Sequence, residues 1–213
     1  MEITIEKQTL DLLPEKGIFW HEQKILIVAD IHIGKAATFH HYGIPVPEGS
    51  MEDDLKNLSS LINCYQPQAC IVVGDLIHSK EGLTPPLISY ISEWLESVNS
   101  SIHLVFGNHD RALIKKLPDN WNLQCHYQEL IIPPFRFCHI PNIHSVFFTW
   151  SGHLHPTFSF SGKGDKLRLP CFYLSELQGI LPAFSSFVGG YDMKKKKNDQ
   201  IFVTTGKKVI KIF

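Results

Sequence analysis

Short apolar runs that end at polar residues recur along the first half of the chain. Three of them are Ile25 to Ala29 (ILIVA), Ala69 to Val73 (ACIVV) and Ile102 to Phe106 (IHLVF). Apolar runs of this length, bounded by polar residues, are typical of buried strands. The residues that follow them are Asp30, Gly74-Asp75 and Gly107-Asn108. We therefore expect three strands, each leading directly into a candidate functional residue.

Two stretches between these runs have the spacing of helices. In Ser50 to Tyr65, the apolar side chains that recur at helical intervals are Leu55, Leu58, Leu61 and Ile62. The stretch from Pro85 to Val98 begins with proline, which the first turn of a helix tolerates. An alternation of strands and helices predicts an α/β architecture with parallel strand pairs.

The second half of the chain changes character. From Leu123 onward the apolar runs are short and strand-like, namely IIPPFRFCHI, SVFFTW, KLRLPCFYL, QIFVTT and KKVIKIF. Few helical stretches lie between them. We predict a single domain over residues 1–213, in which two facing sheets are flanked by helices.

Composition narrows the class of protein. With 44% hydrophobic and 19% charged residues, the chain has enough apolar surface for a sizeable buried core. The formal net charge of -1 provides no overall field for nucleic acid, so a basic contact would have to be local. The run Lys194 to Lys197 is one candidate; it either grips a phosphate backbone or forms a basic loop without a partner.

Location follows from what the sequence lacks. No apolar run reaches the roughly 18 residues of a membrane-spanning helix. The first residues, MEITIEKQTL, have the pattern of neither a signal peptide nor a transit peptide. The five cysteines include no C-x-x-C pair, which favours reduced thiols over a disulfide framework. We expect a cytoplasmic protein with no membrane partner.

Histidine is abundant, and it clusters with Asp, Asn and Gly just after the apolar runs. The twelve histidines include those of Asp30-Ile31-His32, Gly107-Asn108-His109-Asp110 and Gly152-His153-Leu154-His155, and His139 follows FRFC. Ligands of open α/β sheets gather at the carboxyl ends of strands, so these residues are expected in one crevice together with Asp75.

The residue types and their spacing point to metal binding. In D-x-H and H-x-H, two side chains on an extended segment point the same way and reach one metal region. Mixed oxygen and imidazole ligands suit Mn, Fe or Zn rather than Ca. A carboxylate can bridge two cations about 3.5–4 Å apart, the separation used in two-metal phosphoryl chemistry. The glycines before Asp75, Asn108 and His153 would allow tight turns and close approach of substrate.

The ordered set D-x-H, GD, GNHD, H and GHxH resembles the signature of the calcineurin-like metallophosphoesterases. The resemblance implies a four-layer αββα sandwich with a dinuclear centre. It implies that Asp30, His32 and His155 hold the first metal, that Asn108, His139 and His153 hold the second, and that Asp75 bridges both. The expected cofactor is a pair of divalent cations, with Mn²⁺ as the leading choice and Fe, Zn, Ni and Co as alternatives.

A narrower resemblance covers about residues 20 to 190. The segments ADIHIGKAATFHHYGIPVP, GHLHP, LRLPCFYL and LPAFSSFVGG are similar to the bacterial ligase-associated DNA damage response endonuclease family. This resemblance implies a setting in DNA repair and a functional association with a DNA ligase and a helicase. It suggests nucleic acid as the substrate.

Further residues near these motifs are candidates for catalysis or substrate binding. His109, beside Asn108, is the best candidate to protonate the leaving oxygen. The family resemblance implies that Asp110 orients or polarises it. Lys35, His40 and His41 line either a phosphate groove or a solvated loop. Arg111 is either a phosphate contact or an ordinary surface residue. The histidines that fit no motif are interpreted as structural: His78, His103, His126 and His144.

Three functions compete. The leading one is a metal-dependent phosphodiesterase or nuclease in DNA repair. The second is a phosphatase or phosphodiesterase on small nucleotides or other small phosphoesters, and the same metal centre would serve both. The third is a non-catalytic scaffold for protein binding, which would be expected to lack several ligands or His109. All of these residues are present.

Overall fold

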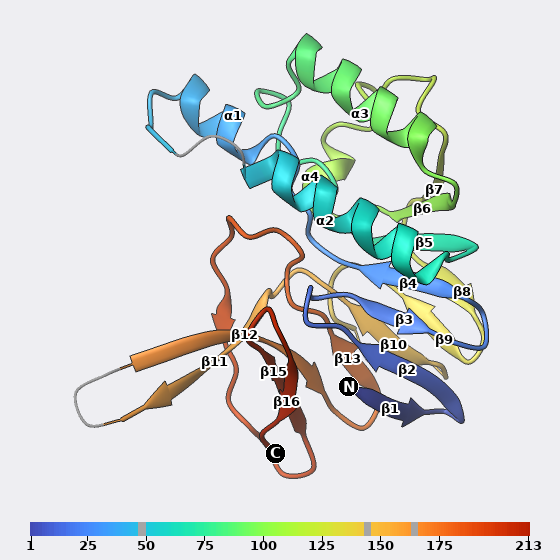
Figure 1. Cartoon of the computed structure of the whole chain (residues 1–213), viewed down its shortest axis with the longest axis vertical. Coiled ribbons are helices and arrows are strands. Elements are labelled where there is room, and N and C mark those ends of the chain that lie inside the picture. The colour runs from blue at the N-terminus through green and yellow to red at the C-terminus, as the bar shows by residue number, and fades with distance from the viewer. Residues whose placement is uncertain (47–49, 143–145, 163–165) are drawn as a thin grey trace.

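Two β-sheets lie face to face in the computed structural model, and helices cover one outer side (Figure 1). The structure describes residues 1–46, 50–142, 146–162 and 166–213, without the side chains of residues 50–52. The first sheet has seven strands, which are β1 (Glu2–Ile5), β2 (Gln8–Leu12), β3 (Ile18–Trp20), β4 (Ile25–Val28), β5 (Ala69–Val73), β6 (Ser101–Val105) and β7 (Leu123–His126).

The order of the first sheet follows the chain, but its two halves differ. Strands β1 to β4 pair antiparallel, whereas β4 to β7 pair parallel. The expected strands are β4, β5 and β6, and each ends within a residue of the predicted position. Val28 pairs with Val72, which in turn pairs with Leu104, so the carboxyl ends of the three strands are aligned at one edge.

Helices α2 (Ser50–Tyr65) and α3 (Pro85–Ser97) cover the outer face of this sheet, as the apolar spacing predicts. Leu55 and Leu58 of α2 are completely buried against sheet residues such as Val28. The indole of Trp94 donates a hydrogen bond of 2.8 Å to Ser59 Oγ and joins the two helices. Two shorter helices are α1 (Lys35–His41) and α4 (Asn108–Arg111). In the part of the chain that the structure describes, no helix has the length and apolarity to cross a membrane.

The second sheet is built from the C-terminal half. Its nine strands are β8 (Leu130–Ile132), β9 (Phe135–Phe137), β10 (Phe148–Ser151), β11 (Pro156–Ser161), β12 (Lys166–Leu174), β13 (Gln178–Ile180), β14 (Tyr191–Asp192), β15 (Gln200–Thr204) and β16 (Val209–Lys211). β10 pairs parallel with β9 and β13, and β11 with β12 forms an antiparallel hairpin that projects from the body.

The main core lies between the sheets. It contains large side chains from both, including Trp20 of the first sheet and Phe137, Trp150 and Phe172 of the second, all fully buried. Burial of side chains of this size contributes about 1.5–3 kcal/mol each. This core holds the strand ends of the two sheets in one place, so that residues about 120 positions apart in the sequence meet.

The predicted fold class is confirmed: the chain is α/β, with two mixed sheets and flanking helices. The N-terminal antiparallel strands β1 to β3 were not predicted individually. Among the described residues the helices lie over the first sheet, and the outer face of the second sheet carries a small cluster around Tyr173 and Val203 instead of a helical layer. Partly buried side chains such as Met193 pack on this cluster and exclude water from it.

Candidate metal centre

The residues predicted as ligands converge at the edge where the strands of both sheets end. Asp30, Asp75 and Asn108 follow β4, β5 and β6 of the first sheet. His139 follows β9 and His153 follows β10 of the second sheet. His32 and His155 complete the set, each two residues beyond one of these positions.

A first group consists of Asp30, His32 and His155. Their ligand atoms all lie within 4.8 Å of one another. His155 Nε2 is 3.3 Å from Asp30 Oδ1 and also 3.3 Å from His32 Nε2. One carboxylate oxygen and two imidazole nitrogens therefore face a common point, which is the donor set that a first-row divalent cation accepts.

A second group surrounds His139, which is buried. Its Nε2 atom is 3.1 Å from Asn108 Oδ1, 3.2 Å from His153 Nδ1 and 3.3 Å from Asp75 Oδ2. The carboxylate of Asp75 and the rings of His139 and His153 form a set that could hold a cation. The amide oxygen of Asn108 adds a neutral donor on the exposed side.

Asp75 stands between the two groups. Its Oδ2 atom is 3.9 Å from His32 Nε2 in the first group and 3.3 Å from His139 Nε2 in the second. Its other oxygen, Oδ1, accepts a hydrogen bond of 3.0 Å from the amide of His109. The position of Oδ2 is that of an oxygen which two cations can share.

Backbone carbonyls hold two of the rings in the ligand orientation. His155 Nδ1 donates to Gly189 O at 3.1 Å, and His139 Nδ1 donates to Val73 O at 3.2 Å. A proton on Nδ1 leaves the lone pair of Nε2 free, and in both rings Nε2 points into its group. Such outer hydrogen bonds fix the tautomer and the direction of metal-binding histidines.

The charges at the site favour a cation. Asp30 Oδ1 is buried and accepts no hydrogen bond from the residues that the structure describes, which is costly for a carboxylate oxygen unless positive charge lies nearby. Burial lowers the pKa of His139 and His155, but the carboxylates Asp30 and Asp75 outweigh it and raise both pKa values. The same attraction would act on a metal ion, so the residues fit a divalent cation.

His32 is held as the neutral ligand form. Burial, together with the neighbouring histidines, lowers the pKa of His32 to about 3. A neutral imidazole is the form that binds metal.

The ligand loops adopt a backbone conformation that the sequence did not predict. The expectation of an extended segment for D-x-H and H-x-H is wrong, because the residues with left-handed φ angles include Asp30 (55°), His32 (51°), Asp75 (50°), His153 (68°) and His155 (46°). Non-glycine residues rarely occupy this region, and such strain clusters at functional sites. Left-handed turns, instead of an extended segment, direct both side chains of each motif toward the metal centre.

Glycines make room for the ligands themselves. A Cβ on Gly107 would lie 2.0 Å from Asp75 Oδ1, and a Cβ on Gly152 would lie 2.5 Å from Asp30 Oδ2. We expected these glycines to let the substrate come close to the backbone. At Gly107 and Gly152 the groups that come close are instead the ligand carboxylates. Any side chain at these two positions would displace a carboxylate.

His109 is half-buried at the edge of the centre. Its Nδ1 atom donates to His78 O at 2.6 Å, and its Nε2 atom lies 3.9 Å from Asp75 Oδ2. The Asp110 carboxylate does not bond this ring. It accepts hydrogen bonds from the Ile77 amide (3.1 Å) and the Gly107 amide (3.0 Å), and it is fully buried. Asp110 therefore fixes the backbone that carries Asn108 and His109.

His78, interpreted from the sequence as structural, lies at the site. Its Nδ1 atom is 3.2 Å from His32 Nδ1, and its ring stacks on His109 with a centroid separation of 4.9 Å. With Nε2 of His32 as the ligand atom, the proton of His32 lies on Nδ1 and is donated to His78. Burial, together with the charges of His109 and Lys35, lowers the pKa of His78 to about 4, so its ring is a neutral acceptor. The sequence feature that could have placed His78 at the site is its position three residues after Asp75.

The four candidates for substrate binding differ in their distance from the metal centre and in their exposure. Lys35, at the start of α1, is half-buried and lines a pocket beside His32. His40 is exposed and its Nε2 atom lies 2.9 Å from Val46 O, while His41 is exposed and contacts Tyr42. Arg111 is exposed and bonds Tyr127 O at 3.4 Å. Of these residues, only Lys35 contacts the wall of the metal centre.

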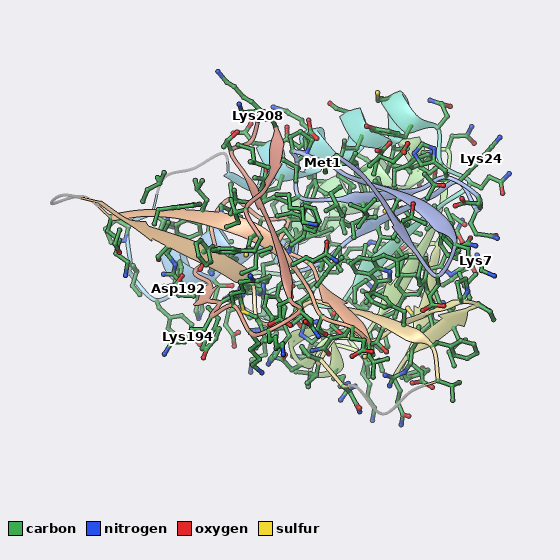
Figure 2. The ribbon with its side chains drawn as sticks, turned by 90° about the horizontal axis from the view of Figure 1, so that it is seen from below. Met1, Lys7, Lys24, Asp192, Lys194 and Lys208 are labelled. Atoms are coloured by element: carbon green, nitrogen blue, oxygen red, sulfur yellow. The ribbon has the colours of Figure 1, made fainter. Side chains whose placement is uncertain are left out.

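The remaining histidines and the lysine run lie elsewhere. His103 and His126 stack on each other in β6 and β7, as a structural role predicts. His144 lies outside the described residues. Figure 2 shows Lys194 beside Asp192, toward the β11–β12 hairpin and away from Lys24. Lys195 lies 4.5 Å from the ring centroid of Phe213.

Two groups of carboxylate and imidazole donors that share one carboxylate define the site of a metal-dependent hydrolase. The chain belongs to the calcineurin-like phosphoesterase family, whose model matches residues 23–205. It is a metal-dependent enzyme that hydrolyses phosphoester bonds.

The five cysteines are all free, as predicted.

One solved structure is similar to the chain over its whole length. The chain is similar to the nuclease MPE of Pseudomonas putida, with 30% sequence identity and a TM-score of 0.86 over 100% of this chain and 99% of that one. It also has a remote similarity to Yfce, a phosphoesterase from E. coli, with 14% identity and a TM-score of 0.39 over 84% and 86% of the two chains. No curated protein sequence matches the chain.

Proposed function

We propose that the chain is a dinuclear metal-dependent phosphodiesterase that acts as a nuclease on DNA, with Mn²⁺ as the leading cofactor. The observation that carries this proposal is the position of Asp75 Oδ2, which faces the His32 group and the His139 group at 3.9 and 3.3 Å. The similarity to a nuclease over the whole chain supports a nucleic-acid substrate.

In this proposal Asp30, His32 and His155 would hold the first cation, Asn108, His139 and His153 would hold the second, and Asp75 would contribute to both. Bound cations supply Lewis acidity at the phosphoryl oxygens and activate water for attack on phosphorus. As water adds, the bond from phosphorus to the leaving oxygen breaks, and that oxygen takes up a proton.

His109 is proposed as the donor of that proton. The hydrogen bond from its Nδ1 atom to His78 O fixes the ring and leaves Nε2 as the atom that can transfer a proton. The side chain is 35% exposed, so Nε2 can reach a bound phosphoester. The ring of His78 stacks on one face and limits its rotation.

A substrate panel with added Mn²⁺ tests this function. It contains bis-p-nitrophenyl phosphate, p-nitrophenyl phosphate, single-stranded and duplex DNA, RNA and cyclic nucleotides. We expect cleavage of the diester and of DNA, and none after metal removal with a chelator. Cleavage of p-nitrophenyl phosphate or small nucleotides alone would favour the alternative of a small-phosphoester enzyme and contradict the nuclease.

A role in DNA repair is part of the same proposal and rests on the resemblance of the motifs to the ligase-associated family. Functional association with a DNA ligase and a helicase follows from the same resemblance. A strain without the gene should be more sensitive to DNA-damaging agents, and the wild-type chain, but not Asp75→Ala, should restore resistance. Equal restoration by both chains would contradict a catalytic role in repair.

A further inference from the structure

A lysine that has no anionic partner among the described residues lies beside the first ligand group. The side chain of Lys35 is half-buried, so its ammonium group is partly desolvated. In the described parts of the chain no carboxylate forms an ion pair with it. The carboxylate of Asp54 lines the same pocket, but it accepts a hydrogen bond from the Ser186 amide and is attracted to Lys16. A desolvated cation without a partner gains most from an incoming anion.

Two aromatic rings stand next to this ammonium group. The Nζ atom of Lys35 is 5.9 Å from the ring centroid of Phe39 and 5.6 Å from that of Phe187. The two rings meet edge to face with centroids 5.7 Å apart, and both are half-buried. The ring of Phe39 also lies beside the ring of His78, with a centroid separation of 6.3 Å. The aromatic pair therefore adjoins the metal centre.

The loop that carries Phe187 is held firmly. The amide of Ser186 donates to Asp54 Oδ1 at 3.1 Å, and the amide of Phe187 donates to Ser185 Oγ at 3.2 Å. Two residues further on, Gly189 O accepts the proton of the ligand His155. The loop that carries Phe187 thus also supports His155 of the first ligand group.

We propose that Lys35, Phe39 and Phe187 form a nucleotide subsite, in which Lys35 pairs with a phosphate next to the scissile one and the aromatic pair takes the adjacent base. This inference rests on the proposed function and specifies how its substrate is bound. Lys35 and Phe187 also line a small pocket beside His32, with room for about one water molecule. Stacking on aromatic rings tolerates any base but requires that the base is unpaired.

Four chromogenic diesters with the same p-nitrophenol leaving group test the subsite with Mn²⁺. They are methyl p-nitrophenyl phosphate, the 5′- and 3′-(p-nitrophenyl phosphate) esters of thymidine, and the preferred one of these with a second phosphate. One thymidine ester should exceed the methyl ester in kcat/KM by about five- to 150-fold, the range that base stacking provides. The second phosphate should raise kcat/KM further.

Variants assign these gains to residues. Phe187→Ala should remove most of the preference for the thymidine ester over the methyl ester, and Phe187→Tyr should retain it. Lys35→Gln should remove the gain from the second phosphate. Phe160→Ala and Lys24→Gln are matched controls, because Phe160 lies on the projecting hairpin and Lys24 lies at the opposite end of β4 (Figure 2).

A binding measurement separates the subsite from turnover. In EDTA, fluorescence anisotropy with labelled tetrathymidylate should show binding that Lys35→Gln and Phe187→Ala weaken about tenfold and the two controls leave unchanged. Hydrolysis of all esters with equal efficiency, or a preference that survives Phe187→Ala, overturns the subsite and leaves the phosphodiesterase intact. No hydrolysis of any ester by the wild type overturns the proposed function and, with it, the subsite.

Discussion

The two ligand groups of the centre are built differently. In the first, Asp30 and His32 are buried, and the supports are a side chain and a loop: the ring of His78 behind His32, and the carbonyl of Gly189 behind His155. In the second, His139 is buried and supported by Val73 O at the end of β5, whereas Asn108 is exposed.

This difference teaches where each position is vulnerable. A support from the main chain of a central strand survives most substitutions, because it requires no particular side chain. Support from His78 or from a loop depends on particular residues outside the ligand set. Cation binding by the first ligand group should therefore respond to substitutions of the residues around its ligands. Cation binding by the second group should respond mainly to substitutions of the ligands themselves.

The strongest test removes what the two groups share. Asp75→Ala deletes the oxygen that faces both, so both cations should be lost and activity should fall by more than the roughly 10²–10³-fold of removing a single transition-state donor. Metal analysis of the purified variant and the diester rate measure this. Two metals per chain at wild-type affinity would contradict the shared ligand.

His109→Ala should separate chemistry from metal binding. We expect both cations to remain and the rate on a DNA diester to fall about 10²–10⁴-fold, the usual contribution of general acid catalysis. The loss should be much smaller with p-nitrophenol as the leaving group, because it needs little protonation. Equal losses on both substrates would remove His109 from this role.

His78→Ala should affect one group only. Without the ring that accepts the proton of His32, the first cation should bind about 10- to 100-fold more weakly, while the second should bind as before. The carbonyl that holds His109 is retained in this variant. Titration of the metal-free protein with Mn²⁺, followed by electron paramagnetic resonance, measures the two affinities.

A histidine of the same kind serves as the control for His78. His126→Ala removes one ring of the stacked pair that His126 forms with His103, neither of which is a ligand, and should change neither affinity. A uniform weakening of both cations in His78→Ala would show that the two groups are not supported independently.

The smallest effect is expected from Arg168→Ala. Arg168 Nε donates to Thr157 Oγ1 at 2.7 Å, and its guanidinium also bonds Gly190 O, next to the carbonyl that holds His155. Loss of this clamp should weaken the first cation by less than about tenfold and leave the second unchanged. Arg168→Lys, which keeps one bond, should fall between the two. Weaker binding of the second cation in Arg168→Ala would contradict the support of His155 by Arg168 through the backbone at Gly190.

Much of the site was predictable because its residues are marked locally. An apolar run that ends at Asp30, Asp75 or Asn108 is visible in one window of sequence, and so are the helices whose apolar faces cover β4 to β6. Parallel strands align such residues at one edge. The antiparallel strands β1 to β3 were harder, because short strands take their identity from the partners beside them.

The sequence by itself determined the fold class, the candidate ligands and His109, because residue type and short-range spacing carry that chemistry. Only the tertiary structure decided that the ligand loops are left-handed, that Asp110 accepts backbone hydrogen bonds and that His78 supports His32. The same holds for Phe187, which is remote from Lys35 in the chain and adjacent to it in space. The reason is physical: contacts between distant segments depend on how the two sheets pack, and no local pattern encodes that packing.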